Sequence, residues 1–160
     1  MKKIKLTQNK YAIVDDEDYE RLIIFKWHTL KSRGKLYAVK QNSKINNLQK
    51  RILMHRDIIT VPKDMQLDHI NGNGLDNRKE NLRICIHQQN QQNQLNPHKN
   101  NKLGIKGVHW NKKRRKFVAQ IRFNGKKLNL GCFNVLGDAD SAYRMAEEKY
   151  FGKFARKYNY

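Results

Sequence analysis

The chain has 160 residues, of which 34 are Lys or Arg and 14 are Asp or Glu, giving a formal net charge of +20. This excess predicts a polyanionic partner such as nucleic acid. The chain carries no apolar run near the roughly 20 residues of a membrane span, which argues against a membrane protein. It also has no Cys-x-x-Cys pair, which argues against a disulfide framework and a thiolate zinc site.

The start of the chain predicts a β-hairpin followed by a helix. Met1-Lys2-Lys3 leads into alternating residues instead of an apolar block, so we expect no signal peptide and a cytoplasmic protein. Residues 1–14 form the expected hairpin, with its turn at Gln8-Asn9-Lys10. The acidic run from Asp15 to Asp18 suits the first turn of a helix, and its consecutive carboxylates favour that structural role over a metal site.

Three short strands are predicted next, over residues 27–30, 36–39 and 48–53. With the hairpin and helix they make a small mixed α+β module spanning residues 1–53. Trp27 is expected to anchor its core, although an aromatic side chain on a basic sheet can also contact nucleic acid. A short helix over residues 54–59 should end before Pro62.

Residues 65–90 predict a strand, a loop of Gly, Asn and Asp, a second strand and a polar helix. Folding this unit back on itself would bring Asp68, His69 and the helix start at His87 to Asn90 into one small cleft. A carboxylate and an amide oxygen there could hold one hard divalent cation, and an imidazole could deprotonate a water beside it. Cys85 near His87 leaves a mixed zinc site as an alternative to strand packing of the cysteine.

The order and spacing of several residues give this unit a specific resemblance. Asp68-His-Ile-Asn-Gly-Asn73, then Glu80-Asn-Leu82, then Asn90 resemble the motif of HNH endonucleases of the homing type found in phage genomes and self-splicing introns. The resemblance covers residues 54–90 and implies a ββα-metal nuclease unit. A His-Arg pair precedes the motif in that family, which implies a phosphate contact for Arg56.

The same resemblance assigns roles within the motif. His69 is the implied general base, Asp68 and Asn90 are metal ligands, and Asn81 braces the loop so that His69 points correctly. The implied cofactor is one divalent ion, Mg²⁺ or Mn²⁺. Many relatives carry His where this chain has Asn90, so His87, one helical turn earlier, remains an alternative ligand or phosphate contact.

The C-terminal third predicts a three-stranded antiparallel sheet packed on one helix. Residues 95–103 belong to a polar, Gln- and Asn-rich linker. Apolar residues alternate along 116–123, and Asn124-Gly125 is the dipeptide of a two-residue hairpin turn. The expected buried positions also include Leu128, Leu130 and Cys132 on the return strand, and Met145 on a helix capped by Asp138. The opposite, basic face of the sheet has a width suited to a DNA major groove.

Residues 104–155 resemble the APETALA or ethylene-response-factor type of DNA-binding domain. The matching residues are Gly107-Val108, Gln120-Ile121-Arg122, Leu130-Gly131-Cys132-Phe133 and Ala142-Tyr143. The resemblance implies that the groove-facing residues are Lys106, His109, Gln120, Arg122, Lys127 and Asn129. Trp110 and the 112–116 turn depart from the family pattern, so its base specificity cannot be transferred. Lys112 and Arg114 in that turn are expected to contact phosphates.

We therefore predict an α+β chain with an N-terminal module (1–53), an HNH nuclease unit (54–94), a linker (95–103) and a DNA-binding domain (104–160). Its expected activity is metal-dependent cleavage of double-stranded DNA, as a monomer or homodimer. One alternative is a DNA-binding regulator with an inactive nuclease unit. Another is an RNA nuclease, which the sheet disfavours because the narrow RNA major groove does not admit it.

Overall fold

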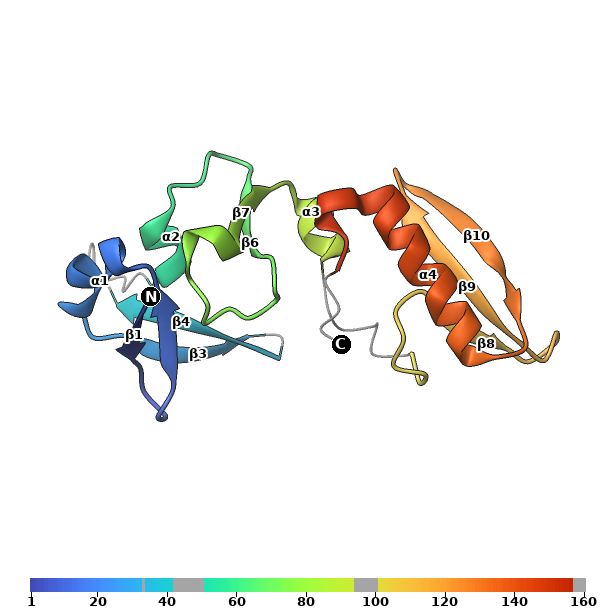
Figure 1. Ribbon diagram of the computed structural model, residues 1–160, viewed down its shortest axis with the longest axis horizontal. Helices are drawn as coiled ribbons and strands as arrows, with labels where there is room; N and C mark the ends of the chain where they lie inside the picture. The colour runs from blue at the N-terminus through green and yellow to red at the C-terminus, as the bar shows by residue number, and fades with distance from the viewer. Residues whose placement is uncertain (33, 42–50, 94–100, 157–160) are drawn as a thin grey trace. The chain divides into compact units, whose positions relative to one another are not determined.

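The computed structural model describes residues 1–32, 34–41, 51–93 and 101–156. The chain divides into two compact units, Met1–Asn90 and Gln91–Tyr160 (Figure 1). Both mix helices and strands, so the predicted α+β class is confirmed. None of the helices in the described ranges is both long and apolar enough to cross a membrane.

The first unit contains three small antiparallel sheets with short helices between them. Its strands pair as β1 with β2, as β3-β4-β5, and as β6 with β7. The elements are β1 Lys2–Lys5, β2 Tyr11–Val14, α1 Asp16–Ile23, β3 His28–Ser32, β4 Lys35–Gln41, β5 Arg51–Leu53, α2 Met54–Ile58, β6 Gln66–His69, the 3-10 helix η1 Lys79–Asn81, β7 Leu82–Cys85 and α3 His87–Gln92. The hairpin, both N-terminal helices, three strands and the strand, loop, strand, helix unit are thus confirmed, except that residues 48–50 lie outside the described part.

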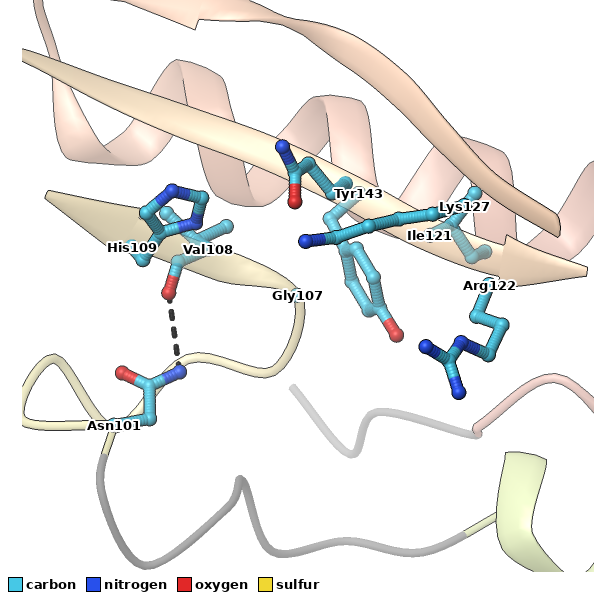
Figure 2. Close-up of a pocket in the computed structure, with 9 residues that line it drawn as sticks. Asn101, Gly107, Val108, His109, Ile121, Arg122, Lys127 and Tyr143 are labelled. Carbon is cyan, nitrogen blue, oxygen red and sulfur yellow. Dashed lines mark hydrogen bonds between the residues drawn. The ribbon is translucent and has the colours of Figure 1, made fainter. Parts of the chain in front are cut away.

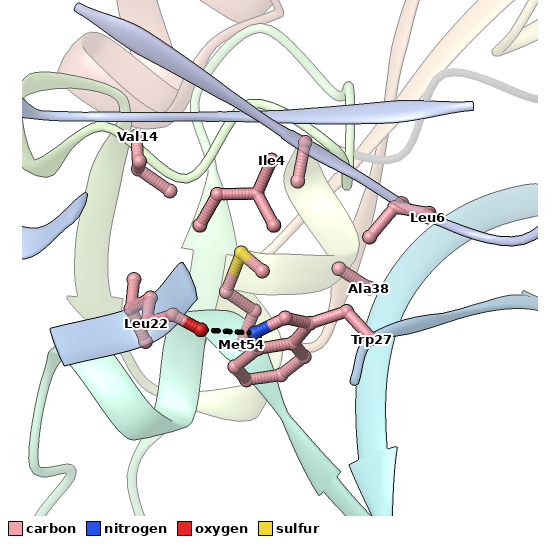
Figure 3. Packing of buried hydrophobic residues seen from close by; sticks show 8 residues of the cluster. Ile4, Leu6, Val14, Leu22, Trp27, Ala38 and Met54 are labelled. Carbon is pink, nitrogen blue, oxygen red and sulfur yellow. Dashed lines mark hydrogen bonds between the residues drawn. The ribbon is translucent and has the colours of Figure 1, made fainter. Parts of the chain in front are cut away.

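An apolar core holds the first unit together (Figure 3). It gathers residues from the hairpin, from α1, from β4 and from α2, and its members are Ile4, Leu6, Ala12, Val14, Leu22, Trp27, Ala38 and Met54. Trp27 is only 2% exposed, and its indole Nε1 donates a hydrogen bond to the carbonyl of Leu22 at 2.8 Å. The prediction that Trp27 is a core anchor is confirmed.

The N-terminal segment also binds the loop of the predicted nuclease motif directly. Ile13 of β2 donates to the carbonyl of Leu75 and accepts from the amide of Asn77, both at 2.8 Å. The amide of Lys79 donates to the Asp15 carboxylate at 2.7 Å. With Met54 inside the common core, the predicted boundary between residues 53 and 54 falls within one compact unit.

The second unit is a three-stranded antiparallel sheet with one long helix on one face (Figure 1). Its elements are β8 Val108–Asn111, β9 Lys116–Phe123, β10 Lys126–Phe133, α4 Leu136–Phe151 and the 3-10 helix η2 Gly152–Phe154. Asn124 and Gly125 both have positive φ, at 48° and 76°, as the predicted two-residue hairpin requires. The predicted linker, residues 95–103, lies mostly outside the described part of the chain.

Two details of this unit differ from the sequence predictions because of backbone geometry. The helix starts at Leu136 with Val135 as its N-cap, so Asp138 lies in the first turn instead of capping it. A register shift between Asn129 and Gly131 leaves Leu130 as an extra residue on β10. An extra residue of this kind shifts the alternation by one, so each side chain of β10 after the bulge points to the face opposite to the one that simple alternation predicts.

The bulge changes where Cys132 lies. Cys132 pairs with Val118 and accepts a hydrogen bond from Arg114 Nη1 at 3.3 Å, so it is not on the helix-facing side as predicted. Met145 was also expected in the core but is 71% exposed, because the buried stripe of α4 runs through Ala139, Tyr143 and Ala146.

Candidate nuclease site

Two neighbouring residues at the end of β6 form the centre of the candidate site. Asp68 pairs with Arg83 of β7, and His69, the last residue of β6, pairs with Leu82. Because side chains alternate along a strand, Asp68 and His69 point to opposite faces of this two-stranded sheet. Their exposed fractions are 4% and 5%, so the structure buries both side chains instead of lining one open cleft.

The imidazole of His69 is anchored by Asn77, a residue that the sequence reasoning missed. His69 Nε2 lies 3.3 Å from Asn77 Oδ1, and Asn77 Nδ2 donates to the carbonyl of Leu75 at 3.2 Å. The second bond turns the amide oxygen of Asn77 toward the ring, so Nε2 carries the hydrogen and Nδ1 carries the basic lone pair. Asn77 is fully buried.

Burial also decides the charge of His69. Removal from water lowers the pKa of His69, while the hydrogen bond to Asn77 and the charge of Asp68 oppose the shift. The neutral ring is the form that can accept a proton. Its environment therefore suits His69 to act as a general base.

The face of β6 that carries Asp68 also holds both candidate partners from α3. Gln66, two residues before Asp68, accepts a hydrogen bond from Asn90 Nδ2 at 2.7 Å, and its own amide lies 3.0 Å from His87 Nδ1. Arg83 completes this face, since its Nε and Nη2 atoms donate to Asp68 Oδ2 at 3.1 and 2.8 Å. The structure thus places Asp68, Asn90 and His87 over one face, with Gln66 and Arg83 as contacts not predicted from sequence.

The donors on this face fit a hard divalent cation. Asp68 supplies a carboxylate, and the bond from Asn90 Nδ2 to Gln66 leaves Asn90 Oδ1 as the oxygen available to a metal. His87 is exposed and already contacts Gln66 through Nδ1. The oxygen donors of Asp68 and Asn90 match Mg²⁺ better than an imidazole does.

Asn81 closes the loop that follows His69. Its side chain accepts from the amide of Asn71 at 3.0 Å and donates to the carbonyl of Asp76 at 2.8 Å. The Arg78 guanidinium beside Asp76 lowers the pKa of that carboxyl, which keeps the Asp76 to Arg78 ion pair, at 2.8 Å, charged. Asn81 thus acts on the loop, whereas Asn77 contacts His69 itself.

Two other candidate metal sites find no support among the residues that the structure describes. Cys85 is completely buried with a free thiol, and it joins no cluster of three metal-binding side chains. Asp15, Glu17 and Asp18 do cluster, but Lys79 inserts between them and forms ion pairs with Glu17 and Asp18 at 2.5 and 3.3 Å. This cluster therefore attaches the nuclease loop to the first helix.

In the second unit, a hollow of about 440 Å³ is lined by residues of all three strands, by Tyr143 of α4 and by two residues that precede β8 (Figure 2). The nine residues that line it contain no carboxylate, and they are Asn101, Gly107, Val108, His109, Gln120, Ile121, Arg122, Lys127 and Tyr143. Lys127 pairs with Arg122, and Asn129 pairs with Gln120, across β9 and β10. Five of the six predicted groove-facing residues, namely His109, Gln120, Arg122, Lys127 and Asn129, thus share the sheet face opposite α4.

Lys106, the sixth predicted groove residue, lies elsewhere. Its Nζ contacts Glu147 of α4 at 3.2 Å and the carbonyl of Gln92 at 2.5 Å. Burial lowers the pKa of Lys106, and the fully buried Glu147 opposes that shift. The groove-facing prediction is wrong for this residue, because it compensates a buried carboxylate. Lys112, Arg114 and, in the first unit, Arg56 are exposed as a phosphate contact requires.

Comparison with known proteins gives a consistent result. The profile of the HNH endonuclease family matches residues 60–92. Protein 3.8 of Escherichia phage T7 is 34% identical over 96 residues, which cover 60% of this chain and 78% of that protein. An uncharacterized HNH endonuclease of Acanthamoeba polyphaga mimivirus is 29% identical over 136 residues, covering 81% of this chain and 69% of its own length. No solved structure gives a significant match.

Proposed function

The chain belongs to the HNH endonuclease family, and from this premise we propose that it hydrolyses phosphodiester bonds of double-stranded DNA with the help of one divalent cation. The observation that supports the proposal most strongly is the pair at the end of β6. Burial keeps His69 neutral, Asn77 orients its ring, and Asp68 shares a strand face with Asn90.

His69 is the proposed general base. Its Nδ1 takes a proton from water as the water oxygen bonds to phosphorus and the bond from phosphorus to the 3′ oxygen breaks. The leaving oxygen takes up a proton from solvent water, giving 5′-phosphate and 3′-hydroxyl ends. Since the ring is only 5% exposed, we expect side chains around it to shift when DNA binds.

Asp68 and Asn90 are the proposed ligands of the cation, Mg²⁺ or Mn²⁺. A bound cation of this kind offsets the negative charge that develops on the phosphate and leaving oxygen, which is worth several kcal/mol. Arg83 holds Asp68 in place through two hydrogen bonds to one carboxylate oxygen. Asn81 is proposed to keep the loop after His69 closed, so that the base stays at the strand end.

The second unit is proposed to hold the duplex, in the manner that its resemblance to the APETALA type implies. His109, Arg122, Lys127 and Asn129 are exposed on the face opposite α4. The first three also line the hollow in Figure 2. A hollow lined by Arg122 and Lys127 without a carboxylate suits a backbone phosphate. Lys112 and Arg114, at the tip between β8 and β9, are proposed to contact further phosphates.

The test of this function is incubation of the full-length chain with supercoiled plasmid. With Mg²⁺ we expect nicked or linear product, whose proportions show whether one or both strands are cut, and a chelator should stop the reaction. Binding of the plasmid without any cleavage across Mg²⁺ and Mn²⁺ would favour the DNA-binding regulator instead. Cleavage of duplex RNA in preference to DNA would reject the substrate proposed here.

A further inference from the structure

Two further rings, from α2 and β4, contact the ring of His69. His55 of α2 packs against the His69 ring with centroids 4.9 Å apart and planes at 85°. Tyr37 of β4 lies 6.0 Å from the His55 centroid and 6.1 Å from the His69 centroid. We refer to Tyr37 and His55 as the ring wall. Both precede residues 60–92, the part that the family profile covers.

The ring wall is also fitted to the loop that follows His69. A Cβ on Gly74 would come within 2.7 Å of two Tyr37 ring atoms and 2.4 Å of the Leu36 carbonyl oxygen. Tyr37 can therefore touch the loop only because residue 74 is glycine. His55, in turn, is only 5% exposed.

A histidine ring needs such contacts to act in one orientation. The torsion that turns an imidazole plane is broad and roughly two-fold, so it does not select an orientation by itself. The 3.3 Å bond from Nε2 to Asn77 fixes one edge of the His69 ring. An edge-to-face ring neighbour is a favoured packing geometry that fixes the plane.

We propose that His55 is a positioning residue for the nuclease reaction: supported by Tyr37, its ring holds the His69 imidazole in the plane that bonds Asn77 and presents Nδ1 to water. This inference rests on the proposed role of His69 as the base. It extends the site to two residues that precede the profile match at residues 60–92.

Charge is consistent with this role. Burial, with smaller contributions from His69 and Arg56, lowers the pKa of His55 to about 3. His55 is then neutral at pH 7 and places no second positive charge against the base. The contact between the two rings is therefore one of shape and ring quadrupole.

The test compares His55→Ala with His55→Phe in the full chain. Removing the ring should lower the single-turnover cleavage rate by about 10- to 100-fold, as expected when a catalytic group is misplaced. DNA affinity should stay within about twofold, because neither ring is a phosphate contact. His55→Phe keeps a ring and should retain a rate within about threefold of the wild type.

A matched control separates positioning from stability. Met54→Ala removes a completely buried side chain from the apolar core of the same unit, on the residue next to His55. It should lower the melting temperature but leave the rate of the folded protein unchanged. Equal rate losses for Met54→Ala and His55→Ala would overturn the proposal. If His55→Ala does not fold, His55→Leu fills the space without a ring and takes its place.

The ring nitrogens of His69 give a readout independent of cleavage. In ¹⁵N spectra, with His69→Gln used for assignment, the wild type and His55→Phe should show one tautomer protonated at Nε2. His55→Ala should show a mixture, and an unchanged single tautomer would overturn the proposal. These spectra can be recorded even if the wild type does not cut DNA. A failure of the positioning proposal for His55 can therefore be distinguished from a failure of the proposed nuclease function.

Discussion

The nitrogen of His69 that carries hydrogen determines what this site can do. Asn77 is bound to the Leu75 carbonyl through its NH₂ group, which turns its oxygen to His69 Nε2. The choice of tautomer thus depends on a residue eight positions after the histidine. Asp68 and His69 could be selected from sequence because the order of the motif is specific, but the role of Asn77 depends on a loop conformation that sequence spacing does not give.

The identity of the second metal ligand can be tested with two variants. Asn90→Ala removes an oxygen donor, and His87→Ala removes an exposed ring that contacts the same Gln66. We expect Asn90→Ala to raise the Mg²⁺ concentration for half-maximal rate by at least about tenfold. His87→Ala should change it little. If His87→Ala raises that Mg²⁺ concentration and Asn90→Ala does not, the second ligand is His87.

The lowered pKa of His55 also predicts how the free energy of unfolding depends on pH. Its folded-state pKa of about 3 is lower than its usual value of 6.5, so the unfolded chain binds a proton first as pH falls. Below about pH 6.5 this group should lower the free energy of unfolding by up to about 1.4 kcal/mol per pH unit. In His55→Phe this contribution to the pH dependence should be absent. Urea denaturation of both proteins at pH 7 and pH 5 would measure the difference. An equal loss in both proteins would mean that His55 is not buried as described.

At the scale of elements, the period of the apolar residues and the turn residues predicted the sheet and helix of the second unit. The Asn124-Gly125 turn and the strand alternation are local features, so the sequence displays them directly. The bulge at Leu130 and the position of Lys106 depend on contacts with other elements. Lys106 was predicted on the groove by the resemblance to the APETALA type, but its side chain instead pairs with Glu147 on α4.

Two glycines of the same unit provide a matched test of packing between elements. Gly104 and Gly107 have φ of +70° and +74°, so alanine is strained at either position. Among the described residues, a Cβ on Gly104 would meet nothing within 4 Å, whereas one on Gly107 would lie 1.9 Å from a Tyr143 ring atom. By urea denaturation, we expect Gly104→Ala to cost about 1 kcal/mol and Gly107→Ala about 2 kcal/mol more. Equal costs would show that Tyr143 does not pack against this turn.

At the scale of the whole molecule, the net charge of +20 leads us to expect that salt is the main variable in the proposed DNA binding. The strand and helix pattern predicted one module at residues 1–53, and the HNH resemblance predicted a separate unit at residues 54–94. The structure joins them, because β2 pairs with the motif loop and Met54 enters the shared core. Such long-range pairing has no signature in local composition, so this boundary could not be drawn from sequence.

The salt dependence of binding tests which face of the second unit meets DNA. Replacing Arg122 and Lys127 with Gln should lower the slope of log affinity against log salt by about 2, since each phosphate contact contributes about 0.9. The control replaces Lys149 and Lys153 with Gln. These residues are exposed on α4 and η2, so the control removes the same charge from other elements of the unit. It should leave the slope nearly unchanged. Equal slopes for both double variants would reject the sheet face as the contact.

The most direct measurement is single-turnover cleavage of a labelled DNA duplex by the wild type and by His69→Ala, with the bound fraction measured in the same samples. At saturating Mg²⁺ we expect the wild type to cut. His69→Ala should bind equally well but cut about 10² to 10⁴ times more slowly, the usual contribution of a general base. Cleavage by His69→Ala at the wild-type rate would contradict the assignment of the base and the mechanism built on it.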